Sequence, residues 1–132
     1  MKTTIRFVFA VLALLAGAAG AADKGMIVVA AEGQTAEVSV SDLVARAPFF
    51  LFFDGTGKLL EAVANPYRQA GGSGITVADF LARKGAAVVV AGGFGPQIAD
   101  EMRGKGIATV PFKGSARDAV KSVLQSRNTD KE

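Results

Sequence analysis

Apolar residues occur in short runs along the chain, separated by polar and glycine-rich segments. The runs 26–31 and 86–91 are apolar throughout and of strand length, which is typical of strands buried on both faces of a sheet. The segment 49–53, Phe-Phe-Leu-Phe-Phe, is the most strand-like part of the sequence. A turn signal at 54–57 separates it from a second apolar segment at 59–64. This pattern predicts an antiparallel β-hairpin.

Helical spacing appears in the second half of the chain. The segment 75–84 has an apolar stripe followed by Gly85, and a helix starting at Pro96 is expected to end at Gly104 or Gly106. A strand at 107–112 precedes a helix that begins with the capping-box residues Ser115 and Asp118. This last helix is expected to bury Ala119, Val120, Val123 and Leu124.

Two shorter features complete the pattern. The segment 41–46 predicts a helical turn capped by Ser41 and stopped by Pro48. Residues 126–132 are expected to form a polar tail. Because strands and helices alternate toward the end, right-handed parallel crossovers are required. The pattern therefore predicts an α/β domain over residues 23–125, with a mixed, mostly parallel sheet between helices.

The first 22 residues are interpreted as a separate segment. Lys2 and Arg6 precede an unbroken apolar run at 7–15, and small residues at 16–22 include Ala19-Gly20-Ala21. This is the layout of a secretory signal peptide, and the run falls short of the roughly 20 residues that a membrane span needs. It predicts a secreted or periplasmic protein. The alternative is an uncleaved anchor, which would be the protein's contact with the membrane.

The amino-acid composition excludes several classes of catalytic and binding site. The 132-residue chain has no cysteine, histidine or tryptophan, which excludes disulfides, cysteine-ligated clusters and catalysis by histidine. Loss of Lys2 and Arg6 with the signal would reduce the formal net charge from +3 to +1. The remaining basic residues are scattered, whereas nucleic-acid binding needs a clustered basic face. No nucleic-acid partner is therefore predicted.

Two glycine-rich loops are the main candidates for a binding site. Glycine permits close backbone approach, and free N–H groups at a following helix N-terminus favour an anion. Arg68 is expected beside the first loop and Arg46 near the mouth of the fold, where each would pair with an anionic ligand; the alternative is that each is an ordinary surface arginine. The candidate loop residues are Gly71, Gly72, Ser73 and Gly74 in the first loop and Gly92, Gly93, Phe94 and Gly95 in the second. The alternative is that both loops are tight turns that only reverse the chain.

Other chemistries have less support. Neither glycine loop completes a dinucleotide-binding or phosphate-loop motif. Glu32 and Asp54 follow predicted strands and are the carboxylates that an enzyme would use, but no paired pattern emerges. Met102 has helical spacing from Ile98, which favours core packing over a role as a soft metal ligand.

Several segments, taken in order, resemble a known family. They are Arg46-Ala47-Pro48-Phe49-Phe50-Leu51, Glu61 through Asn65-Pro66, Ala70-Gly71-Gly72-Ser73-Gly74-Ile75, Ala87-Val88-Val89-Val90-Ala91-Gly92, Gly95-Pro96 and Gly106-Ile107. This ordered set is similar to the dinitrogenase iron–molybdenum cofactor biosynthesis family (NifX/NafY-like). The resemblance implies a ribonuclease H-like three-layer sandwich, with a five-stranded mixed sheet flanked by three helices. It also implies a non-catalytic accessory protein that binds an iron–molybdenum or related metal–sulfur cluster and passes it on.

One position departs from the family pattern. Nitrogenase-associated members have a His-Phe-Gly before the Arg-Ala-Pro segment, and the resemblance places Leu43, Val44 and Ala45 there. The usual histidine ligand is therefore absent, and no metal ligand is assigned. Binding would instead use loop amides with Arg46 or Arg68. The alternative is an exported binding module for a small anionic metabolite or a protein partner, in which the fold is reused without a cluster.

Overall fold

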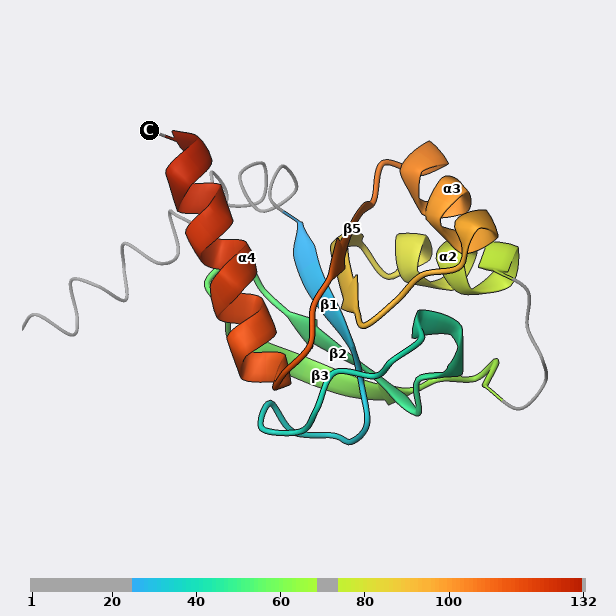
Figure 1. The fold of residues 1–132 in the computed structure, drawn as a ribbon, viewed down its shortest axis with the longest axis horizontal. Helices are drawn as coiled ribbons and strands as arrows, with labels where there is room; N and C mark the ends of the chain where they lie inside the picture. Colours follow the sequence, from blue (N-terminus) through green and yellow to red (C-terminus); the bar gives the residue numbers. More distant parts are fainter. Residues whose placement is uncertain (1–24, 69–73, 132) are drawn as a thin grey trace, which may run out of the picture.

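The computed structural model describes residues 25–68 and 74–131. In this part of the chain a five-stranded sheet lies between α-helices (Figure 1). The strands are β1 (Met26–Ala31), β2 (Phe49–Phe53), β3 (Leu59–Ala64), β4 (Ala86–Ala91) and β5 (Ala108–Pro111). The helices are the short 3₁₀ helix η1 (Val44–Arg46) and the α-helices α2 (Gly74–Arg83), α3 (Pro96–Gly104) and α4 (Ala116–Lys131).

The sheet is mixed, with strand order β3-β2-β1-β4-β5. Strands β1, β4 and β5 are parallel to one another, β2 pairs antiparallel with β1, and β3 pairs antiparallel with β2. In the register, Ala31 pairs with Phe49, and Phe49 pairs with Ala64. The carboxyl ends of β1, β3, β4 and β5 therefore share one edge of the molecule, which we call the carboxyl rim.

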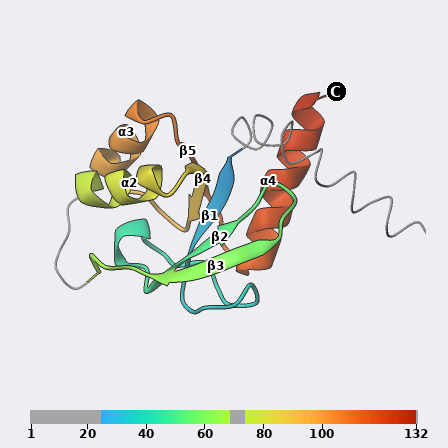
Figure 2. The same ribbon diagram turned by 180° about the vertical axis from the view of Figure 1, so that it is seen from behind.

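Helices cover both faces of the sheet, giving three layers (Figures 1 and 2). On one face, Phe50 and Phe52 pack with Leu81 of α2 and Met102 of α3. The opposite face packs against α4 through a second cluster that includes Phe53. Successive strand residues point to opposite faces, so Phe50 and Phe52 belong to one core and Phe53 belongs to the other. Fully burying such a side chain contributes about 1.5–3 kcal/mol.

The expected fold class is confirmed by this architecture. The predicted bounds of β1, β2, β3 and β4 match the observed strands. Met102 is fully buried, as its spacing indicated. The cap at Ser115 also forms, because the amide of Asp118 donates to the Ser115 Oγ at 3.1 Å.

Two local predictions differ from the structure. Ser41 does not cap a helix: η1 begins after Leu43 without a side-chain cap, and the Ser41 hydroxyl donates to Glu32 instead. The last helix does not end near Leu124 but continues to Lys131, so most of the expected tail is helical. Helix formation propagates at low cost once nucleated, which explains why the helix outlasts its buried stripe.

No helix in the described ranges is both long and apolar enough to cross a membrane. The predicted signal peptide, residues 1–22, lies outside these ranges.

Candidate functional site

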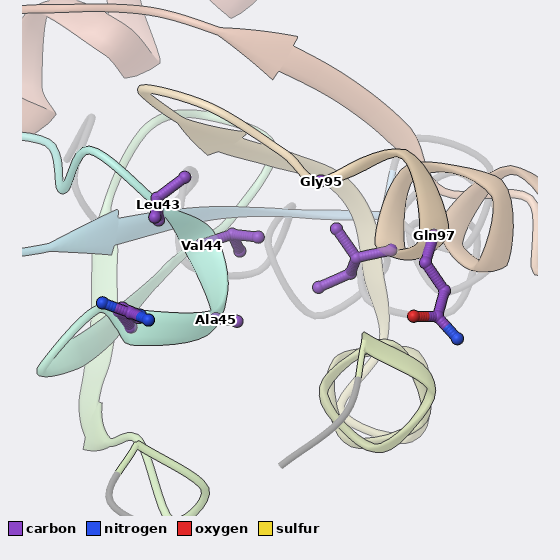
Figure 3. Close-up of a pocket in the computed structure, with 7 residues that line it drawn as sticks. Leu43, Val44, Ala45, Gly95 and Gln97 are labelled. Atoms are coloured by element: carbon purple, nitrogen blue, oxygen red, sulfur yellow. The ribbon is translucent and has the colours of Figure 1, made fainter. Parts of the chain in front are cut away.

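A pocket of about 220 Å³ opens at the carboxyl rim between η1 and the start of α3. We call it the rim pocket. Figure 3 shows Leu43, Val44 and Ala45 on one side and Gly95 and Gln97 on the other. Arg46 and Ile98 complete its lining. Most of these side chains are apolar, so the polar groups of Arg46 and Gln97 stand against a mainly hydrocarbon wall.

A buried asparagine holds η1 in place. Asn65 follows β3 and is 8% exposed. Its Nδ2 donates to the carbonyl oxygens of Ala45 at 3.1 Å and Ala47 at 3.0 Å. Its Oδ1 accepts the amide of Tyr67 at 2.9 Å. Asn65 thus fixes one wall of the rim pocket to the end of the hairpin, a role without a sequence signal because its carbonyl partners lie 20 and 18 residues earlier in the chain.

The glycines after β4 bring a second segment close. The amide of Gly92 donates to the Ser41 carbonyl at 2.7 Å, and the Gly93 carbonyl accepts the Val44 amide at 3.2 Å. A Cβ on Gly92 would lie 2.9 Å from the Asp42 Cα, so no larger residue fits without movement. The structure corrects the role expected for Gly92, because its amide is used within the protein and its lack of a side chain allows backbones to meet.

The start of α3 is the part of this loop that faces the rim pocket. Gly95 is the N-cap, with extended backbone and no side-chain cap, and Pro96 begins the helix. A Cβ built on Gly95 would have no neighbour within 4 Å. The first amides of a helix lack intrahelical partners and favour negative charge. Phe94, by contrast, is half-buried against the core and does not line the pocket.

The two candidate arginines lie at the same rim but not in one pocket. Arg46 is exposed and lines the rim pocket. Arg68 lines a separate cavity of about 320 Å³ beside Phe49 and Asn65. Of the first glycine loop, Gly74 is the first residue of α2, while Gly71, Gly72 and Ser73 lie outside the described residues.

The candidate carboxylates are far apart in the register. Glu32 follows Ala31 at the carboxyl rim, whereas Asp54 follows Phe53, which pairs with Ile27 at the opposite end of β1. Within the described ranges, no group of three or more histidine, cysteine, aspartate or glutamate residues could hold a metal ion. A paired-carboxylate site using Glu32 and Asp54 is therefore inconsistent with the topology.

Each of these carboxylates has a local partner. The Ser41 hydroxyl donates to Glu32 at 2.5 Å. Partial burial raises the pKa of Asp54, but hydrogen bonds from Thr56, Lys58 and Gly57 outweigh that effect and leave this pKa below its usual value. Asp54 thus organises the hairpin turn.

Comparison with known proteins assigns the family. The model of the dinitrogenase iron-molybdenum cofactor family matches residues 25–126, and the chain belongs to this family. No curated protein matches the sequence.

Several solved protein structures have a fold similar to that of this chain. The orange protein from Desulfovibrio gigas, solved in its apo form, is 30% identical with a TM-score of 0.71, and the match covers 76% of this chain and 88% of that one. A putative NifB protein from Thermotoga is 25% identical with a TM-score of 0.66, covering 78% and 90% of the two chains. The protein PH0822, at 22% identity and a TM-score of 0.65, covers 76% and 91% and supports the fold alone.

These findings confirm the family resemblance inferred from the ordered loop segments. They support a role in binding or carrying an iron–molybdenum cofactor or a related group.

Proposed function

We propose that this protein is a non-catalytic accessory protein that binds an anionic metal–sulfur cluster in the rim pocket and passes it on. The observation that carries the proposal is the meeting of Leu43–Arg46 with Gly95–Ile98 around one cavity at the carboxyl rim. In α/β sheets, ligands bind beyond the carboxyl ends of the parallel strands. Leu43, the residue at the family's histidine position, lines this same cavity.

The donor set decides how a cluster would be held. The sequence has no cysteine or histidine. Of the methionines in the described ranges, Met102 is fully buried in the core, and Met26 lies at the start of β1, at the opposite end of that strand from the carboxyl rim. Direct coordination by the usual soft ligands is therefore not available. The rim pocket instead offers the Arg46 guanidinium, the Gln97 amide and the first amides of α3. These groups suit hydrogen bonds to an anion, and the apolar wall excludes water and strengthens them.

A second candidate function follows from Leu43. Its side chain is 46% exposed at the mouth of the pocket, where the family resemblance places a cluster ligand. The alternative is therefore a binding module for a small anionic metabolite or a protein partner. About 220 Å³ is the volume of roughly seven water molecules, enough for a compact anion.

Metal analysis separates the two functions. We expect the protein to bind isolated iron–molybdenum cofactor, measured as iron and molybdenum that remain with it through gel filtration. Arg46→Gln should weaken binding about tenfold or more, because a hydrogen bond to a charged group contributes about 1.5–3 kcal/mol.

Arg103→Gln is the matched control, because Arg103 lies on the exposed side of α3 with its side chain 73% exposed. Failure of the isolated protein to retain either metal, combined with failure to bind added cofactor, would overturn the cluster proposal. Binding of simple anions instead, lost in Arg46→Gln, would favour the alternative.

We also propose that residues 1–22 direct export, so that the protein acts outside the cytoplasm. This rests on the signal-like layout of the segment. Mass analysis of the native protein should show a chain that begins after Ala22, and an intact N-terminus would contradict the proposal.

A further inference from the structure

A second cavity lies on the opposite face of the sheet, between α4 and the strands β4 and β5. It encloses about 320 Å³. Val88 of β4 pairs with Ala108, the first residue of β5, and both form part of its floor. The rim pocket lies beyond the carboxyl ends of the same strands, so the two cavities are separate. We call the second one the α4 cavity.

On this face the sheet is wider than the one described helix that packs against it. Five strands span about 19 Å at the usual spacing, whereas one helix is about 10–12 Å across. In the part of the chain that the structure describes, α4 is the one helix on this face, and it packs over β1 (Figure 1). The β5 side therefore stays open, and Ala108 is exposed there.

The lining of the α4 cavity is apolar on its floor and polar on one wall. Val88, Ala108 and Val110 come from the sheet, and Val123 comes from the helix. The polar wall consists of Ser122, Ser126 and Arg127 of α4. Ser122 and Ser126 stand four residues apart, so they share one face of the helix.

Arg127 brings positive charge to this apolar setting. Its Nη1 atom is buried. Burial lowers the pKa of the Arg127 guanidinium, because removal from water disfavours the charged form. The group nevertheless stays charged at neutral pH. It has five N–H donors in a fork, so it can hold a ligand while keeping its contacts with the protein.

We propose that the α4 cavity binds a small amphiphilic anion, a carboxylate on a compact aliphatic or aromatic body. The carboxylate would lie on Arg127 with Ser126 beside it, and the body would cover Val88, Val110 and Val123. A guanidinium matches a carboxylate through two parallel hydrogen bonds. The volume is at the lower end of the range for small-molecule sites, about 300–1,000 Å³. A hydrated inorganic anion would leave the apolar floor uncovered.

Titration with phenylacetate tests this proposal, with backbone amide signals followed by NMR on the purified protein. We expect phenylacetate to shift the signals of Val88, Ala108, Val110 and Val123. Phenylacetamide, the neutral analogue, and inorganic phosphate should both bind at least tenfold more weakly. Arg127→Gln should weaken phenylacetate binding by about tenfold or more, and Ser122→Phe should block the cavity.

Two controls make the result specific. Arg103→Gln removes a cation from the exposed side of α3 and should leave phenylacetate binding unchanged. Arg46→Gln, which alters the rim pocket, should also leave it unchanged, so the outcome is independent of the proposed cluster function. The proposal is overturned if millimolar phenylacetate moves none of the four signals, or if Arg127→Gln binds it as tightly as the natural protein does.

Discussion

Several residues at the carboxyl rim have structural roles that differ from those the sequence indicated. Asn65 has no role that the sequence pattern indicates, but it joins η1 to the hairpin through two carbonyl oxygens. Gly92 looked like an anion contact, but it allows two backbones to meet. Arg46 lines the rim pocket, the site that we propose for a ligand. The rim pocket thus depends on residues that shape its walls as much as on those that would touch a ligand.

Replacement of Asn65 should destabilise the protein. We expect Asn65→Ala to lower the free energy of unfolding by about 1–3 kcal/mol, because buried carbonyl groups of Ala45 and Ala47 lose their donor. Urea unfolding measures the change. The control Asn128→Ala, at an exposed position of α4, should stay within about 0.5 kcal/mol. Equal stability of the two variants would contradict the role assigned to Asn65.

A methyl group at Gly92 should also be costly. The new Cβ would lie 2.9 Å from the Asp42 Cα and 3.0 Å from its carbonyl oxygen. We expect Gly92→Ala to lower stability by about 1–3 kcal/mol, the usual range for overpacking. At Gly104 a Cβ meets nothing within 4 Å, so Gly104→Ala should be neutral or stabilising. Thermal unfolding of the pair checks this, and a neutral Gly92→Ala would refute the close-packing argument.

At the scale of elements, the sequence predicted most of the strands and helices but fewer of the contacts between them. The strands at 26–31, 49–53 and 86–91 were predictable because unbroken apolar runs have few other stable solutions. The end of α4 was not predictable from the sequence, because polar residues can continue a helix without giving a periodic apolar pattern. The rim pocket could not be derived either, because it needs the hydrogen bonds that join 41–44 to 92–93 across the fold.

The β2–β3 hairpin should weaken in acid. Asp54 accepts from the Thr56 amide at 2.8 Å, the Thr56 hydroxyl at 2.6 Å and the Lys58 amide at 3.0 Å. The pKa of Asp54 is lowered from 3.8, so its contribution is complete above that value and is lost as the pH falls through the lower folded-state value.

Comparison with Asp54→Asn isolates this effect. The natural protein should lose stability below about pH 4 more steeply than the variant does. Unfolding free energies measured across this pH range provide the check. Parallel pH profiles for the two proteins would show that Asp54 does not act in this way.

At the scale of the whole molecule, the two faces of the sheet carry separate features. Residues 43–46 and the start of α3 line the rim pocket at the carboxyl rim, and on the opposite face of the described sheet α4 borders the α4 cavity. The family and the fold are those of dinitrogenase iron-molybdenum cofactor proteins. The chain lacks cysteine and histidine altogether, so the cluster that we propose for the rim pocket would be held there by charge, amides and shape.

A crystal structure of the cofactor-loaded protein, with anomalous data at the molybdenum absorption edge, tests this most directly. The account predicts a molybdenum peak in the space between residues 43–46 and 95–98, with the Arg46 side chain turned toward it. A peak bound elsewhere on the molecule would contradict that account.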